Sequence, residues 1–150
     1  MKPLSFHSIY FRQAIELASR SHCQRKQVGC VITSLDFAHV LGSGYNGGAA
    51  GQDNVCDSPE VEGNCGCLHA EDNALLKVSA PPSEPKILFC THLPCPYCAK
   101  RIVNKRGFKH VWYLTAYRNR QGEEILHNAG IDVMQYPSSY LDLSAREIPT

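Results

Sequence analysis

Two short motifs constrain this 150-residue chain more than any other feature. The first is His69-Ala70-Glu71, in which a carboxylate follows an imidazole by two residues, and the second is Pro94-Cys95-Pro96-Tyr97-Cys98, which offers two thiols. One histidine and two cysteines are three zinc ligands, which leave a fourth tetrahedral position open, as in catalytic zinc sites. Glu71 would then carry a proton for a water at that position. The fold must therefore bring the two motifs together around one metal.

The composition argues against several classes of partner. The net charge is only +1, so no general affinity for nucleic acid or membranes is indicated. The N-terminus lacks the apolar stretch of a secretion signal, and no apolar run approaches the length of a membrane span. Eight cysteines without a secretion route indicate a reducing compartment, where cysteines serve as metal ligands or core residues. We expect a cytoplasmic protein (in the host cytoplasm, if viral) with one domain over residues 1–150.

Helical and strand patterns alternate along the chain. This alternation predicts a three-layer α/β domain, with helices covering a central sheet. A flexible glycine-rich loop at 46–51 and a polar, irregular stretch at 52–66 interrupt it, and the tail from residue 137 has no clear pattern. The expected helices are 6–20, 69–78, 94–105 and 121–128, and the expected strands are 28–33, 38–45, 86–91, 110–114 and 131–134.

The spacing within each motif predicts how the ligands are presented. Cys95 and Cys98 fall at the start of a predicted helix, where free backbone N–H groups and the helix dipole favour thiolates. Residues two apart do not share a helix face, so the helix that carries His69 and Glu71 should present its N-terminal end to the metal. The alternative is a structural zinc knuckle, in which Glu71 only complements the helix dipole.

Together the two motifs match the pattern of zinc-dependent nucleobase deaminases. The amino-acid sequences around them, at residues 69–74 and 91–100, resemble those of the deoxycytidylate deaminases, which belong to the zinc-dependent cytidine and deoxycytidylate deaminase superfamily. The likeness covers roughly residues 8 to 135, and the Gly-Tyr-Asn-Gly at 44–47 separates this branch from tRNA and free-nucleoside deaminases. Further matching segments lie at 21–29 and 128–133.

The resemblance implies a fold and an activity. The fold would be cytidine-deaminase-like, with a mixed five-stranded sheet flanked by helices. The reaction would be the zinc-dependent hydrolysis of dCMP to dUMP and ammonia, which supplies dUMP for thymidylate synthesis. Relatives of this type usually form homo-oligomers, commonly hexamers. Many also bind the effectors dCTP and dTTP near the glycine-rich loop, but Ala49 stands here where they often have proline, which loosens that loop.

The resemblance also implies residues that contact the substrate. Arg25 would bind the 5′-phosphate, for which a charge-assisted arginine contact is well suited. The alternative for Arg25 is an ordinary exposed cation. The remaining contacts would be Asn46 with the sugar hydroxyl, Ala70 and Asn73 with the nucleotide, and Tyr117 and Arg118 near the mouth of the site or at a subunit contact.

Four further cysteines suggest a second metal. Some viral members of the resembled family hold a structural zinc at the positions of Cys23 and Cys56, closed by two histidines, which Cys65 and Cys67 would replace here. Such a metal would hold a loop that has little to pack against. The alternative is a set of unliganded thiols. Cys30 and Cys90 lie in apolar strands as core residues, and His92 is expected beside the metal site but not as a ligand.

Other functions stay open at this point. A related deaminase could act on modified dCMP, on dCTP or on nucleic acid, and the basic residues between 100 and 109 would favour the last of these. A nucleic-acid reader should add aromatic stacking residues to such a patch, and only Phe108 and Trp112 qualify. A non-catalytic zinc module is the third reading, although it gives Glu71 no task.

Overall fold

The computed structural model describes residues 2–141 and 143, and its centre is a five-stranded mixed sheet with the strand order β2-β1-β3-β4-β5. β1 is antiparallel to β2 and β3, whereas β3, β4 and β5 are parallel. The elements are α1 (Phe6–Ala18), β1 (Gly29–Ser34), β2 (Val40–Tyr45), α2 (Ala70–Leu75), β3 (Lys86–His92), α3 (Pro96–Lys105), β4 (Phe108–Thr115), α4 (Gln121–Asn128), β5 (Asp132–Gln135) and the 3-10 turn η1 (Ser138–Tyr140).

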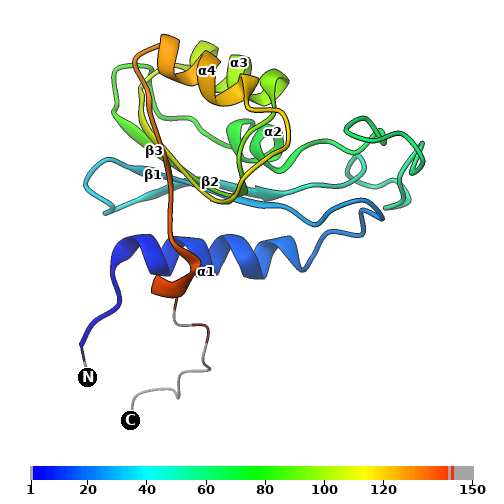
Figure 1. Cartoon of the computed structure of the whole chain (residues 1–150), viewed down its shortest axis with the longest axis horizontal. Helices are drawn as coiled ribbons and strands as arrows, with labels where there is room; N and C mark the ends of the chain where they lie inside the picture. Colours follow the sequence, from blue (N-terminus) through cyan, green and yellow to red (C-terminus); the bar gives the residue numbers. More distant parts are fainter. Residues whose placement is uncertain (1, 142, 144–150) are drawn as a thin grey trace.

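Helices cover both faces of the sheet, which makes the domain three-layered, as predicted (Figure 1). α1 packs on one face, where Phe11 and Ala14 meet Val31 and Phe89. α2, α3 and α4 pack on the opposite face around a larger apolar cluster. β1 can serve both layers because successive side chains of a strand point to opposite faces, so Val31 joins the first cluster and Ile32 the second.

The C-terminal ends of β3 and β4 and the start of β1 lie together, next to the predicted functional residues. The parallel strands β3 and β4 finish at His92 and Thr115, next to the cysteine motif and Tyr117. The antiparallel β1 begins beside the end of β3, because Cys30 is paired with Cys90, and the Gly29 N–H donates to the Thr91 hydroxyl. Carboxyl ends of parallel strands are where open α/β sheets bind ligands.

The observed elements follow the predicted ones, with boundaries that differ by up to three residues. α2 ends at Leu75, three residues before the predicted end at 78, and turns lead on from it. α3 begins at Pro96, because Cys95 has extended backbone angles and is the N-cap residue. The tail contributes the turn η1, which returns to α1 through a bond between the Ser8 hydroxyl and the Tyr140 carbonyl.

Residues 46–69 form a long connection between β2 and α2. From residue 48 to residue 69, all of which the structure describes, Cys56 is the single buried residue. The connection closes where Gly47 and Leu68 exchange two backbone hydrogen bonds of 3.1 and 2.8 Å. Among the described residues, no helix is long and apolar enough to cross a membrane.

Candidate active site and a four-cysteine cluster

The three predicted ligands meet between the starts of α2 and α3. His69 is the N-cap of α2 and Cys95 the N-cap of α3, so both helices direct their N-terminal ends to one point. The His69 Nδ1 lies 3.5 Å from the Cys95 Sγ and 3.3 Å from the Cys98 Sγ. A tetrahedral zinc with nitrogen at about 2.0 Å and sulfur at about 2.3 Å separates such donor atoms by about 3.5 Å. The donor set therefore fits zinc.

The ligands hold complementary charge even without a metal. Hydrogen bonds from Cys98 and His69, against burial, lower the pKa of Cys95 to about 4. The bond to Cys95, together with nearby acidic groups, raises the pKa of His69 to about 9. Cys95 is thus a thiolate at neutral pH, the form that binds metal. Its backbone setting contributes, because the Cys98 N–H donates to the Cys95 sulfur at 3.5 Å.

Glu71 lies in the first turn of α2, with only 4% of its surface exposed. Burial raises the pKa of Glu71 to about 7, and the charge of His69 only partly opposes this. A carboxyl group that titrates near neutral pH can both accept and release a proton during turnover. The geometry thus gives Glu71 the properties of a proton carrier beside the zinc ligands.

An ion pair ties the two ligand-bearing helices together. The Arg101 Nε on α3 contacts the Asp72 Oδ1 on α2, and the Asp72 side chain is only 9% exposed. The Arg101 guanidinium also lies over the Tyr97 ring, 5.4 Å from its centroid. Since Asp72 follows Glu71 directly, this pair neutralises a second carboxylate beside the proton carrier.

A cavity of about 170 Å³ opens onto this centre. Its wall contains His69, Glu71 and Cys95, so a ligand in the cavity reaches the reactive groups. Four of the six predicted substrate contacts also line it: Arg25, Asn46, Ala70 and Tyr117.

The other two predicted substrate contacts are not among the described residues that line this cavity. The Asn73 amide donates to the Tyr45 carbonyl at 2.8 Å, which ties α2 to β2. Arg118 is 88% exposed and pairs with Glu62 at 3.5 Å on the rim. Both differences arise from tertiary contacts: Asn73 faces the neighbouring strand, and Arg118 faces the long connection.

Asn46 lines the cavity but already makes two bonds to the protein. Its Oδ1 accepts the Val28 N–H at 2.8 Å, and its Nδ2 donates to the Lys26 carbonyl at 2.7 Å. An amide has two donor hydrogens and two acceptor lone pairs, so one of each is left for a ligand. Through these two bonds, Asn46 also holds the backbone conformation of the segment that carries Arg25.

Sequence reasoning gave no role to Lys26 or Glu62, whose side chains line the cavity, whereas His92 lies beside the predicted metal site as expected. The Lys26 ammonium lies 5.3 Å from the centre of the Tyr117 ring. Burial, together with the charge of Lys26, lowers the pKa of His92 to about 4, so the ring is neutral at pH 7. Lys26 sits beside Arg25 in the sequence, and that pairing of cations was the available signal.

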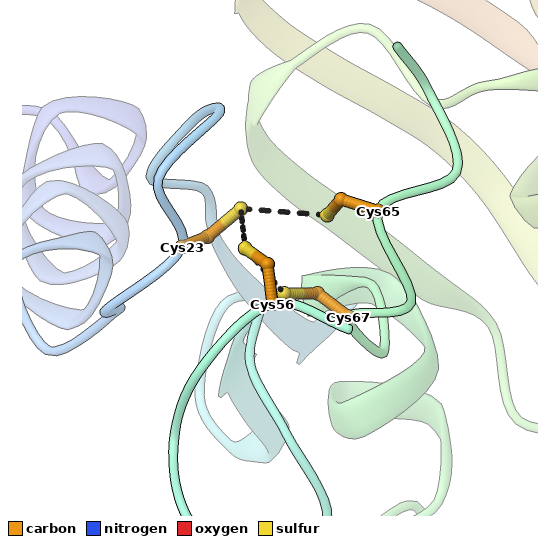
Figure 2. Close-up of side chains that lie close together, drawn as sticks. All are labelled: Cys23, Cys56, Cys65 and Cys67. Carbon is orange, nitrogen blue, oxygen red and sulfur yellow. Dashed lines mark hydrogen bonds between the residues drawn. The ribbon is translucent and has the colours of Figure 1, made fainter. Parts of the chain in front are cut away.

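The other predicted ligand group forms a compact cluster of sulfurs (Figure 2). The Cys56 Sγ lies 3.6 Å from the Cys23 Sγ and 3.5 Å from the Cys67 Sγ, and the Cys23 Sγ lies 3.7 Å from the Cys65 Sγ. All four sulfurs lie within 4.8 Å of one another. A tetrahedral zinc with four sulfurs at about 2.3 Å separates them by about 3.8 Å. We call Cys23, Cys56, Cys65 and Cys67 the four-cysteine cluster.

Known proteins share both sequence and fold with this chain. The deoxycytidylate deaminase of Saccharomyces cerevisiae (strain ATCC 204508 / S288c) is 36% identical over 148 residues, which cover 91% of this chain and 46% of that protein. The chain thus spans about half the length of this relative. ComE operon protein 2 of Bacillus subtilis (strain 168) is 32% identical over 155 residues, or 98% of this chain and 80% of that protein.

A solved structure agrees with the fold as well as the sequence. The dCMP deaminase of cyanophage S-TIM5, in complex with dCMP and dUMP, superposes with a TM-score of 0.76 at 35% identity and covers 91% of this chain and 99% of that one. Residues 4–115 also match the family described as the cytidine and deoxycytidylate deaminase zinc-binding region. The chain therefore belongs to the zinc-binding cytidine and deoxycytidylate deaminases.

Proposed function

We propose that the protein hydrolyses dCMP to dUMP and ammonia, and so supplies dUMP for thymidylate synthesis. The observation that carries this proposal is the cavity in which His69, Cys95 and Glu71 share one wall with Arg25 and Lys26. Such a cavity offers a zinc centre and a proton carrier to the base, and two cations to a phosphate. The relatives named above support the same substrate.

His69, Cys95 and Cys98 would hold the zinc. A zinc bound there would supply Lewis-acid chemistry and lower the pKa of a bound water to about 7. Glu71 would accept a proton from the water that attacks C4 of the cytosine and deliver it to the ring nitrogen. A second proton transfer through Glu71 to the amino group lets ammonia leave, and the ring becomes uracil. Glu71 is only 4% exposed and lines the cavity, so it would carry this proton within the site.

The substrate contacts follow from the cavity wall. Arg25 would bind the 5′-phosphate, and the free donor and acceptor of Asn46 would bind the sugar hydroxyl. The backbone of Ala70, at the start of α2, would contact the base, and Tyr117 would close the cavity beside Lys26. Asn73 and Arg118 would act indirectly, through Tyr45 and Glu62.

A second, structural zinc would occupy the four-cysteine cluster. Four thiolates at tetrahedral spacing suit zinc, and a closed set of four protein ligands leaves no position for a substrate. We further propose that residues 1–150 act as one domain in a cytoplasmic homo-oligomer, most simply a hexamer. Control by dCTP and dTTP would be weak here, since Ala49 leaves the adjoining loop less constrained than proline would.

A turnover panel tests the proposed reaction. Purified protein should release ammonia from dCMP with a much higher kcat/KM than from cytidine, deoxycytidine or dCTP, with dUMP as the product. Turnover of dCTP or of 5-substituted dCMP in preference to dCMP would move the assignment to another cytosine nucleotide. Deamination of oligonucleotides with steep salt dependence would indicate a nucleic-acid substrate instead. Ammonia release from none of them would leave a non-catalytic zinc module.

A further inference from the structure

The four-cysteine cluster is part of the wall of the substrate cavity. Among the described residues that line the cavity are Cys23, Cys65 and Cys67, while Cys56 lies behind them and is buried. The cluster joins three segments of the chain: the turn after α1, the middle of the long connection and its end before α2 (Figure 2). Whatever fixes the sulfurs therefore also fixes the shape of the cavity.

A backbone hydrogen bond links the cluster to the segment that carries the two cations of the cavity. Arg25 and Lys26 follow Cys23 by two and three residues, and all three line the cavity. The Gln24 N–H donates to the Cys56 sulfur at 3.3 Å. Backbone N–H groups directed at sulfur stabilise a thiolate and orient it toward a metal. The Gln24 bond to Cys56 and the bond from the Asn46 amide to the Lys26 carbonyl restrain the backbone of the segment from which Arg25 and Lys26 line the cavity.

The opposite rim depends on the cluster in the same way. Glu62 and Gly63 lie between Cys56 and Cys65 and line the cavity. Glu62 pairs with Arg118, and a side chain added at Gly63 would begin 3.4 Å from the Tyr117 hydroxyl. Because Cys56 is the single buried residue of the described stretch 48–69, apolar packing does little to hold this rim. A metal would supply the free energy that packing does not.

The catalytic ligands, by contrast, are held without the cluster. The paired backbone bonds of Gly47 and Leu68 lie between Cys67 and His69 in the chain and tie the start of α2 to the end of β2. Cys98 is fully buried on α3, and its neighbours Ala99 and Ile102 lie in the apolar core. Loss of order at the cluster should therefore reach Arg25 and Lys26 before it reaches the zinc ligands.

We propose that zinc in the four-cysteine cluster is a substrate-positioning metal, which holds Arg25 and Lys26 where they bind the 5′-phosphate. The metal then governs the KM for the nucleotide and leaves kcat almost unchanged. Lys26 joins Arg25 as a specificity-determining residue, because both cations follow the same sulfur-anchored turn. This inference rests on the proposed dCMP activity for its substrate, but its metal content is independent of that activity.

Cys56→Ser provides the test, because Cys56 contributes a sulfur to the cluster without being among the described cavity-lining residues. Metal analysis should find two zincs per wild-type chain and one per variant chain. The KM for dCMP should rise at least about tenfold while kcat stays within about twofold. The kcat/KM for deoxycytidine, which has no phosphate, should hardly change. Cys30→Ala, in a buried cysteine outside both ligand sets, should keep two zincs and the wild-type KM.

Two further variants separate positioning from a general loss of structure. Cys65→His still offers a zinc ligand, so it should keep two zincs and raise the KM less than Cys65→Ser does. Arg25→Ala combined with Lys26→Ala should keep both zincs and raise the KM. Adding Cys56→Ser to this double variant should raise the KM little further, because all three changes remove the same interaction, the contact of the two cations with the 5′-phosphate. If Cys56→Ser does not fold, Cys65→Ser replaces it in the same assays, and the cation variants test the phosphate contact on their own.

The outcomes distinguish the two proposals. One zinc per wild-type chain, or iron in place of zinc, overturns the zinc in the four-cysteine cluster. Loss of one zinc with an unchanged KM in Cys56→Ser, or a fall in kcat with the KM unchanged, overturns the positioning role. If the wild type does not turn over dCMP, the proposed reaction fails while the zinc count still tests the cluster, and calorimetric binding of dCMP against deoxycytidine then replaces the KM.

Discussion

Gly122, in the first turn of α4, packs directly on the carbonyl of Pro94, the residue before the proposed zinc ligand Cys95. A Cβ placed on Gly122 would lie 2.2 Å from the Pro94 oxygen and 3.1 Å from the Cys95 carbonyl carbon. No side chain fits at that distance without movement of the backbone. α4 therefore supports the turn that presents Cys95, although it contributes no ligand itself.

Gly122→Ala should displace the Pro94–Cys95 turn and weaken zinc binding at the catalytic site. We expect a loss of zinc from that site and at least a tenfold loss of kcat, with destabilisation of about 1–3 kcal/mol from overpacking. Metal analysis and denaturant unfolding provide the measurements. Gln121→Ala, at an exposed position of the same helix, is the matched control and should behave as the wild type. Full zinc content and activity in Gly122→Ala would show that α4 does not support the turn.

Glu71→Gln should abolish proton transfer while the metal stays bound. Glutamine fills the same volume but cannot accept a proton, so kcat should fall by about 10²–10⁴-fold or more. The zinc content should equal that of the wild type, because Glu71 is not one of the ligands. Glu124→Gln, at an exposed position on α4, serves as the control. Near-normal turnover in Glu71→Gln would assign proton transfer to another group.

The buried Glu71 should also make the metal-free protein less stable as the pH rises. Burial raises its pKa from the ordinary value of 4.5 to about 7, so between these values the folded state holds a proton that the unfolded chain has released. Stability falls with rising pH wherever the folded state binds more protons. Urea unfolding after chelation should show a steeper fall from about pH 4.5 to about pH 7 in the wild type than in Glu71→Gln. Parallel profiles would contradict the buried environment of this carboxyl group.

Arg101→Ala should disturb Glu71 through Asp72. The negative charge of Asp72 already contributes to raising the pKa of Glu71, and removal of Arg101 leaves that charge without its partner. The acidic limb of the pH–kcat profile should move to higher pH, and the free energy of unfolding should fall by about 1–3 kcal/mol. Lys100→Ala, at an exposed position of the same helix, should change neither quantity. An unchanged acidic limb would show that Arg101 contributes to stability but does not affect the pKa of Glu71.

Local sequence was sufficient to predict the zinc ligands. His69 and Glu71, and likewise Cys95 and Cys98, are separated by less than one helical turn, so the start of each helix sets their relative positions. The alternation of helical and strand patterns predicted the three-layer arrangement, and the sheet confirms it. The grouping of Cys23 with Cys56, Cys65 and Cys67 needed the resemblance to relatives as well, since these residues are far apart in the chain.

Tertiary structure decided which polar side chains face the cavity. Asn73 and Arg118 are turned to Tyr45 and Glu62, while Lys26 and His92 reach the cavity because β1 begins where β3 ends. Lys86 shows the same limit of sequence reasoning, since its ammonium group is buried against three carbonyls, those of Pro81, Glu84 and Arg106. These outcomes depend on contacts between distant segments. A residue's near neighbours in sequence determine how a helix begins, but only the packed sheet determines which side chain meets which.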